Sequence, residues 1–247
     1  MLEAKNLKKS FGSLQAVADT SFVVRPGELV GLLGPNGAGK TTTISMLTGL
    51  TQPDSGAVLI DGKPLHGDTD PSKARIGVVP QELAIYEELS AAANLRFFGS
   101  LYGLHGDRLI QAMDSALELV GLSAQRNTKV KEYSGGMQRR LNLAASLLHD
   151  PDILLLDEPT VGVDPQSRNA IFDNLEVLKQ RGKTILYTTH YMEEVERLAD
   201  RVIIMDHGQV IADDTIAALH TQLPQVAGKH ANLESVFLAL TGRQLRD

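Results

Sequence analysis

The sequence contains no cysteine and no tryptophan, and only 4% of its residues are aromatic. Without cysteine, the fold cannot depend on disulfide bonds and catalysis cannot use a thiolate. The chain also lacks a long apolar run. Its longest stretch without Asp, Glu, Lys or Arg, residues 215–228, is shorter than the roughly 20 residues that a membrane-spanning helix needs. We therefore expect that the chain does not cross a bilayer by itself.

The first residues lack the pattern of a signal peptide. Charged residues (Glu3, Lys5, Lys8 and Lys9) occupy the positions where such a peptide has its apolar segment, so we expect a cytoplasmic protein. The 247 residues, 43% of them apolar, are enough to bury a full core as one large or two small domains. The net charge of −6 weakly disfavours a protein whose main task is to bind nucleic acid.

Short apolar runs alternate with helical patterns along the chain, an order that predicts an α/β fold with a mostly parallel sheet. The clearest strands are expected at 29–33, 75–79, 153–156, 184–188 and 201–205. The first, third and last of these are almost continuously apolar, as expected of strands that are covered on both faces.

Helical patterns dominate between the second and third of these predicted strands. Three helices are expected there, at 90–103, 107–121 and 137–149, with Asp107 as the cap of the second. We interpret residues 82–150 as a helical insertion in a core made of residues 1–81 and 151–220. Residues 1–220 would then form one domain, followed by a short C-terminal extension, 221–247, with one short helix near 232–240.

A phosphate-binding loop directly follows the strand at 29–33. The run satisfies the pattern Gly-x-x-x-x-Gly-Lys-[Ser/Thr] and leads into a helical pattern. Its glycines let backbone N–H groups face a phosphate, its lysine adds a positive charge, and its threonine hydroxyl can bind Mg²⁺. The alternative is a glycine-rich turn, and a chance match arises on the order of once in a hundred chains of this length. The candidate residues are Gly34, Asn36, Gly37, Ala38, Gly39, Lys40, Thr41 and Thr42.

Two carboxylates, Asp157 and Glu158, end the apolar strand that starts at Ile153. Ligands of open α/β sheets bind at the carboxyl ends of the strands. Because neighbouring side chains of a strand point to opposite faces, we expect Asp157 to bind a metal ion and Glu158 to act as general base on a water. Taken alone, two such acids indicate a solvated turn, but a phosphate loop in the same chain favours the site.

Two further polar residues follow predicted strands. His190 comes after the strand at 184–188, where an imidazole can bind a terminal phosphate and hold the attacking water. Gln81 comes after Val79-Pro80, and its amide can reach both Mg²⁺ and water. Each of these residues, taken alone, is more often an ordinary packed or solvated side chain.

A second possible anion site lies at Ser134-Gly135-Gly136, just before the third helix of the insertion. Serine is a favoured N-cap, and the glycines leave backbone N–H groups uncovered. Local sequence alone favours a simple capped helix. One nucleotide rarely needs two helix starts that lie far apart in a chain, however, so this helix start is expected to face the nucleotide of another subunit.

With these motifs in order, the sequence resembles the nucleotide-binding subunits of ATP-binding cassette (ABC) transporters over nearly its whole length. The Walker A loop 34–42, the Q-loop Gln81, the signature 134–136, the Walker B strand 153–157 with Glu158, the D-loop 162–164 and the switch His190 each occur once, in family order. The resemblance implies a P-loop NTPase core with a small antiparallel β subdomain and an inserted α-helical subdomain.

The resemblance also implies how the residues act. Phe11 matches the adenine-stacking aromatic of the family, although a phenylalanine beside Gly12 is equally suited to core filling. Two ATP molecules with Mg²⁺ would lie between two subunits arranged head to tail, each between one Walker A loop and the partner's signature. Asp164 would lie near the dimer seam, and Thr41, Gln81 and Asp157 would bind the metal.

Details of the signature narrow the branch. Tyr133 and Met137 replace the commoner Leu and Gln, and the run Tyr-Ser-Gly-Gly-Met-Gln-Arg-Arg-Leu resembles ATPase subunits of bacterial exporters of drugs, lipids and polysaccharides. This implies a membrane-spanning partner on a separate chain, a second ATPase subunit that is identical or related, and a location on the cytoplasmic face of the cell membrane.

Two alternatives remain at this stage. A soluble ABC ATPase that acts on nucleic acid or ribosomes usually has two cassettes or a long coiled-coil insertion, and neither is present in this sequence. A phosphate-loop kinase would leave Ser134-Gly135-Gly136 and His190 unexplained.

Overall fold

The computed structural model describes residues 1–67, 69–222 and 233–241. They divide into two compact units. The first unit lies within Met1–Lys73 and Thr184–Asp247, and the second unit is Ala74–Lys183. Each unit contains some of the functional residues that the sequence predicts.

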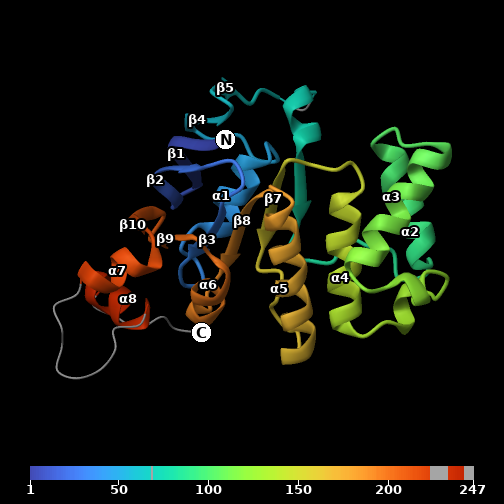
Figure 1. The fold of residues 1–247 in the computed structure, drawn as a ribbon. Helices are drawn as coiled ribbons and strands as arrows, with labels where there is room; N and C mark the ends of the chain where they lie inside the picture. The colour runs from blue at the N-terminus through green and yellow to red at the C-terminus, as the bar shows by residue number, and fades with distance from the viewer. Residues whose placement is uncertain (68, 223–232, 242–247) are drawn as a thin grey trace. The chain divides into compact units, whose positions relative to one another are not determined.

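Four strands of the first unit form an antiparallel layer in the order β5-β4-β1-β2 (Figure 1). Along β1, Leu2, Ala4 and Leu7 are buried and most residues between them are exposed, so one face of this layer covers a core. The strands are β1 (Leu2–Phe11), β2 (Leu14–Val24), β4 (Ser55–Ile60) and β5 (Lys63–Pro64).

The first unit continues into a parallel layer centred on β3 (Leu29–Leu33). This strand pairs in parallel with β8 (Thr184–Thr189) on one side and β9 (Arg201–Asp206) on the other. β10 (Gln209–Asp214) runs antiparallel to β9 and parallel to β2, and so joins the two layers. Every residue of β3, β8 and β9 is buried. Burial on both faces explains why β3 and most of β9 are almost continuously apolar.

The described residues of the first unit include the helices α1 (Lys40–Leu47), α6 (Met192–Leu198), α7 (Ile216–Gln222) and α8 (Leu233–Thr241). α6 packs closely against β3, because a Cβ atom at Gly31 would lie only 2.8 Å from Cγ1 of Val195. Glycine at position 31 therefore sets the short distance between this helix and the sheet.

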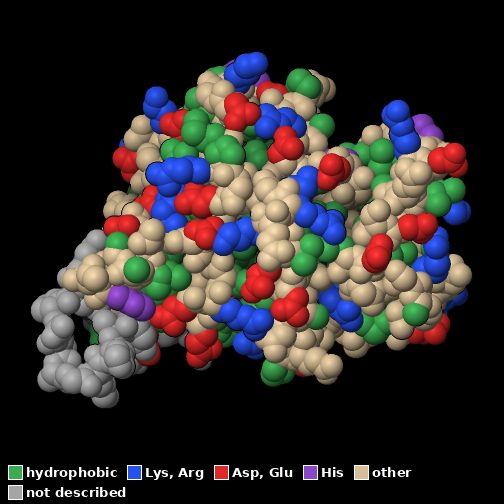
Figure 2. Space-filling model, in the orientation of Figure 1, with side chains coloured by type: hydrophobic (Ala, Val, Ile, Leu, Met, Phe, Trp, Pro, Cys, Tyr) green, Lys and Arg blue, Asp and Glu red, His purple; other side chains and the backbone are tan. Residues whose placement is uncertain are grey.

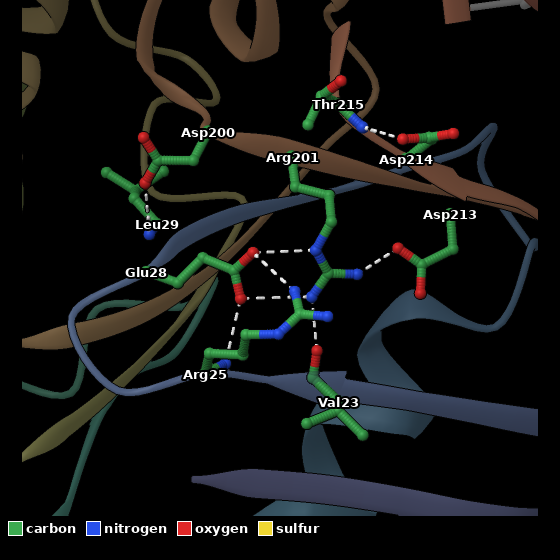
Figure 3. Close-up of polar contacts among 9 residues, drawn as sticks. All are labelled: Val23, Arg25, Glu28, Leu29, Asp200, Arg201, Asp213, Asp214 and Thr215. Carbon is green, nitrogen blue, oxygen red and sulfur yellow. Dashed lines mark hydrogen bonds and ion pairs between the residues drawn. The ribbon is translucent and has the colours of Figure 1, made fainter. Parts of the chain in front are cut away.

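A buried arginine joins several strands of the first unit (Figure 3). Arg201 is 8% exposed and donates hydrogen bonds to both carboxylate oxygens of Glu28 (2.8 and 3.2 Å), to Asp213 and to the carbonyl of Val23. Burial alone raises the pKa of Glu28, but the hydrogen bonds and the charge of Arg201 outweigh burial and lower it. The cluster fixes the start of β9 against β10 and the end of β2.

In the second unit, β6 (Ile76–Val79) and β7 (Ile153–Asp157) pair in parallel. Between them in sequence come three helices that contact one another, drawn in green to yellow in Figure 1. These are α2 (Ala91–Leu101), α3 (Gly106–Leu119) and α4 (Gly135–Leu147), and α5 (Pro165–Gln180) follows β7. Short 3-10 turns are η1 (Pro71–Arg75), η2 (Ser123–Gln125) and η3 (Val130–Glu132).

The predicted α/β fold class is confirmed: the core strands are mostly parallel, an antiparallel layer is present, and helices α2 to α4 lie within 82–150. One local expectation is wrong. Asp107 does not cap α3, which begins at Gly106 with His105 at the N-cap position and no side-chain cap. Asp107 lies in the first turn, where its charge favours the helix dipole.

The short helix expected near 232–240 corresponds to α8 at 233–241, and residue 232 lies outside the described residues. The division into a domain 1–220 and an extension 221–247 stays a prediction.

Candidate functional site

The glycine-rich loop 34–39 leads from β3 into α1 in the first unit. The N–H of Gly34 donates to the carbonyl of Thr189 (3.3 Å), and that of Ala38 donates to the carbonyl of Pro35 (3.1 Å). Gly37 (φ 81°) and Gly39 (φ 102°) adopt left-handed backbone conformations that other residues rarely reach. A loop curled in this way turns successive N–H groups toward an anion.

Lys40 braces this loop at the first turn of α1. Its side chain is buried, and Nζ donates to the carbonyls of Gly34 (2.8 Å) and Pro35 (3.1 Å). The N-cap position is Gly39, and no side chain in the described part of the chain caps the helix. The start of α1 is therefore suited to an anion, and Thr41, in its first turn, is exposed.

His190 follows β8 directly, one residue after the carbonyl that accepts from Gly34. The backbone around it is fixed by the carboxylate of Glu194, which is 2% exposed and accepts hydrogen bonds from Tyr187 and from Oγ1 of Thr189 (2.7 Å). Oγ1 of Thr189 in turn accepts from the N–H of Tyr191 (3.0 Å). The position of His190 near the loop therefore rests on a buried polar network.

Phe11 ends β1 in the first unit and is 53% exposed. It is not a core residue, so the second role that the sequence left open for it is excluded. Nζ of Lys9 lies 5.6 Å from the centre of its ring. An exposed aromatic face of this kind is suited to stacking on a planar ring.

Asp157 and Glu158 end β7 in the second unit, and both are buried. Glu158 has a φ of 45°, in the left-handed region that is unfavourable for residues other than glycine. Its carbonyl accepts from the N–H of Val161 (3.2 Å), so the chain turns sharply there. Backbone strain at a buried carboxylate is a feature that clusters at functional sites.

The segment Ser134-Gly135-Gly136 starts α4. Oγ of Ser134 accepts from the N–H of Met137 (3.3 Å) and caps the helix. Ser134 and Gly135 are exposed, and a Cβ atom at Gly135 would meet nothing within 4 Å. Gly136 is buried, and a Cβ atom there would lie 2.0 Å from Oγ of Ser167. Gly135 thus leaves open surface, whereas Gly136 permits close packing on α5.

Asp164 caps α5, because its Oδ1 accepts from the N–H groups of Gln166 and Ser167 (3.0 Å each). Hydrogen bonds from the side chain and the backbone of Ser167 lower the pKa of Asp164 below its ordinary value. Since Ser167 also packs against Gly136, it connects the starts of α4 and α5. Gln81, after β6, is exposed, and its carbonyl accepts a hydrogen bond from Arg139.

A family model described as ABC transporter matches residues 17–161. The chain belongs to the ABC transporter family. This range includes the Walker A loop, Gln81, the signature and Glu158, and it ends before His190.

Curated relatives of this ABC cassette agree with the family. The linearmycin resistance ATP-binding protein LnrL of Bacillus subtilis is 49% identical, over 90% of this chain and 72% of that protein. The Nod factor export ATP-binding protein I of Cupriavidus metallidurans is 37% identical, over 100% of this chain and 99% of that protein. The predicted ATP-binding cassette is therefore confirmed, and a phosphate-loop kinase is excluded.

Solved structures confirm the cassette fold. An ATP-binding subunit of an ABC transporter has a TM-score of 0.84 at 30% identity, covering 98% of this chain and 99% of that chain. The cassette MJ0796, solved as a dimer in a post-hydrolysis state with ADP and Pi, has a TM-score of 0.77 at 27% identity, covering 87% of this chain and 98% of that chain.

The sequence did not reveal three residues that hold the cassette's functional loops. Arg139 was noted only as part of the Gln-Arg-Arg-Leu run, and its contact with Gln81 is a tertiary one. Ser167 carries no motif. Glu194 had a recognisable signal, because it lies four residues before Leu198 on the buried face of α6.

Proposed function

We propose that this ABC cassette is the Mg²⁺-dependent ATPase subunit of a membrane exporter and works as a head-to-tail dimer. The observation that carries the proposal is the presence of two helix starts suited to phosphate, α1 after the loop 34–39 and α4 at Ser134. One nucleotide needs one such loop, so the second helix start serves the nucleotide of a second subunit. That subunit is a copy of this chain or a related one.

The similar proteins support this proposal. Linearmycin resistance and Nod factor export are the processes named for two relatives, which favours export over an ABC ATPase that acts on nucleic acid or ribosomes. On the face drawn in Figure 2, the basic and acidic side chains of the described residues alternate, and they form no continuous basic patch. Proteins that bind the phosphate backbone of a nucleic acid usually present such a patch.

We assign nucleotide binding to the exposed aromatic of β1 and to the loop that begins α1. Phe11 stacks on the adenine, the backbone N–H groups and Lys40 hold the phosphates, and the signature of the partner closes over them. The residues are Phe11, Gly34, Asn36, Gly37, Ala38, Gly39, Lys40, Thr41 and Thr42, with Ser134, Gly135 and Gly136 acting on the partner's nucleotide.

The proposed metal ligands are Thr41, Gln81 and Asp157. They offer hydroxyl, amide and carboxylate oxygens, the donors that Mg²⁺ prefers. Among the residues that the structure describes, no group of three or more His, Asp or Glu is arranged to hold a metal ion. This donor set fits a metal that is held partly by phosphates, and bound Mg²⁺ neutralises phosphate charge.

We assign Glu158 as the general base that takes a proton from the attacking water. Its burial and its fixed turn limit the directions in which the carboxylate can point. His190 donates a hydrogen bond to the terminal phosphate, held in place by the network around Glu194. Gln81 orients the water as well as the metal.

A cluster of exposed aromatic side chains in the second unit supports docking to a membrane chain. Tyr86 packs edge to face on Phe97 (ring centroids 5.2 Å apart) and lies 6.3 Å from Phe98. Tyr86 is 51% exposed and Phe97 is 40% exposed. We propose that this cluster, the segment after Gln81 and the insertion 82–150 transmit movement to the partner.

No helix within the described ranges is both long and apolar enough to span a membrane. We propose, from the export functions named for the relatives, that the partner is an integral membrane chain that holds this subunit on the cytoplasmic face of the cell membrane.

Replacing Glu158 by Gln tests the catalytic assignment. We expect kcat to fall by about 100-fold or more while ATP affinity stays within about twofold, because only proton abstraction is lost. Phosphate release and equilibrium ATP binding measure the two effects. Glu193→Gln, which alters an exposed carboxylate in the first turn of α6, is the matched control and should hydrolyse ATP normally. Unchanged turnover in Glu158→Gln would refute the assignment.

Purification of the tagged chain from detergent-solubilised membranes of its own organism tests the transport role. We expect mass spectrometry to identify a multi-span membrane protein in the purified complex. Recovery of only soluble or ribosomal partners, in a detergent that preserves such complexes, would leave the ATPase assignment in place and refute export.

A further inference from the structure

Arg139 contacts two functional loops of the second unit at once. It lies on α4, five residues after Ser134, and its guanidinium donates to the carbonyl of Gln81 and, through Nη2, to the carbonyl of Val161 (3.4 Å). Gln81 follows β6, whereas Val161 lies between Glu158 and Asp164. One side chain of the signature helix therefore connects the loop of the proposed metal ligand with the loop that follows the proposed base.

The surroundings of Arg139 are unusual for an arginine. It is half-buried, and burial lowers the pKa of its guanidinium. No carboxylate within the described residues pairs with it, so two carbonyl groups are its hydrogen-bond partners. Partial burial of a cation without an acidic partner costs stability, and such costs are typical of functional positions.

A second residue of α4 holds the same segment. Asn142 is 3% exposed, and its Oδ1 accepts from the N–H of Ala84 (3.2 Å). On α2, Asn94 accepts from the N–H of Tyr86 (2.7 Å) and donates to its carbonyl (2.9 Å). The backbone of 81–86 is therefore held at three successive points, two of them from the signature helix.

We infer that Arg139 is a positioning residue that couples the signature helix to Gln81 and to the segment between Glu158 and Asp164. When the signature engages the partner's nucleotide, the planar guanidinium fork moves both loops together, which the single ammonium of a lysine cannot do. The inference rests on the proposed function for the roles of Gln81 and Glu158. It assigns a positioning role to a residue outside the signature 134–136.

The contact itself is tested without ATP. In Arg139→Met, which keeps an apolar stem and removes every donor, hydrogen exchange of the amides in 81–86 and 159–163 should be several-fold faster. Arg140→Met is the matched control: Arg140 lies next on α4, but its Nη1 donates to the carbonyl of Val120 at the end of α3 (2.7 Å). Equal exchange in both variants would overturn the inference.

Kinetics test the coupling. Arg139→Met should lower kcat about tenfold and change the KM for ATP less than about twofold, whereas Arg140→Met should not change kcat. In a Gln81→Ala background, Arg139→Met should lower kcat by clearly less than tenfold further, because the part of its effect that passes through Gln81 is already lost. Arg139→Lys should recover little of the activity, because one ammonium cannot replace the guanidinium at both loops. A full tenfold further loss in the double variant would overturn the coupling. If the wild-type chain does not hydrolyse ATP, the proposed function is refuted. The hydrogen-exchange experiment would still show whether Arg139 holds the segments 81–86 and 159–163.

Discussion

The two units begin their functional helices in opposite ways. In the first unit, α1 starts at Gly39 without a side-chain cap. In the second unit, α4 is capped by Ser134 and α5 by Asp164. The first N–H groups of α1 therefore have no side-chain cap and can bind an anion, whereas those of α4 and α5 are partly satisfied by the chain itself. Under the proposed function, this difference predicts that ATP binds first at the loop of the first unit.

The same contrast appears in two arginines. Arg201, in the first unit, pairs with the carboxylates of Glu28 and Asp213 and so connects strands of that unit (Figure 3). Arg139, in the second unit, holds two loop carbonyls without an acidic partner. Carbonyl contacts of one cation are more easily exchanged than a buried ion pair. Under the proposed function, the ion pairs of the first unit hold the part that binds nucleotide, and the carbonyl contacts of the second unit hold the loops that respond to it.

The largest expected effect comes from Lys40, since it both braces the open helix start and supplies charge. Lys40→Ala should lower kcat/KM for ATP by about 100- to 1,000-fold, because the loop loses two internal hydrogen bonds and the phosphates lose a cation. Calorimetric ATP titration and phosphate release measure the loss.

Lys73→Ala is the matched control for Lys40, because Nζ of Lys73 also donates to a glycine carbonyl, that of Gly49 (3.2 Å). It should bind ATP with unchanged affinity. Similar losses in both variants would show that the open start of α1 has no special role.

The sequence was sufficient for the parts of the molecule that depend on local pattern. The buried strands and the loop from Gly34 follow from apolar runs and from one motif, and the structure has them within one or two residues of the predicted bounds. The cap of α3 was wrong because Asp107 and His105 are two residues apart, and sequence alone rarely locates a helix start that closely.

Features that depend on tertiary contacts were not predictable. The exposure of Phe11 depends on what packs around β1, and the role of Ser167 depends on the approach of α4 to α5. The left-handed backbone of Glu158 has no sequence signal, since glycine is the residue that usually marks such a conformation. Sequence motifs therefore identify the reacting groups, and the structure is needed to find the residues that hold them.

The next prediction concerns the start of α4 in the second unit, which Ser134 caps. Ser134→Arg should abolish ATP-dependent dimerisation in a Glu158→Gln background, because a long cation would occupy the surface that the partner's nucleotide needs. Light scattering with and without ATP measures it. Ser90→Arg is the matched control, since Oγ of Ser90 caps α2 with a similar bond to Ala93 (3.2 Å). A Ser134→Arg variant that still dimerises would refute the composite site.

The cluster around Arg201, with Glu28 and Asp213, predicts a smaller effect, which concerns the stability of the fold. Arg201→Met should lower the free energy of unfolding by about 3 kcal/mol, because it removes the buried cation that pairs with both Glu28 and Asp213. Arg25→Met is the control: Arg25 also pairs with Glu28 (3.5 Å), but its side chain is 68% exposed, so the loss should stay below about 0.5 kcal/mol. Chemical denaturation measures both losses. Equal losses would show that the buried Arg201 contributes no more stability than the exposed Arg25.

This cluster also gives a pH dependence. Because folding lowers the pKa of Glu28, its contribution is present above the unfolded pKa of about 4.3 and is lost as the pH falls below that value. Between about pH 5 and pH 3, the wild type should therefore lose more stability than Arg201→Met does. If the stability of both proteins falls equally over this pH range, the pairing of Glu28 with Arg201 does not cause the pH dependence.

The smallest effect distinguishes the two signature glycines. Gly136→Ala should destabilise the chain by about 1–3 kcal/mol, because its Cβ would lie 2.0 Å from Oγ of Ser167. Gly135→Ala meets nothing within 4 Å and should be neutral or slightly stabilising in the helix. Ser167→Gly should restore part of the loss in Gly136→Ala, since the capping bond from the backbone of residue 167 to Asp164 is kept. Thermal melts of the four proteins measure this, and equal destabilisation by both alanines would mean that close packing on α5 does not explain why Gly136 is a glycine.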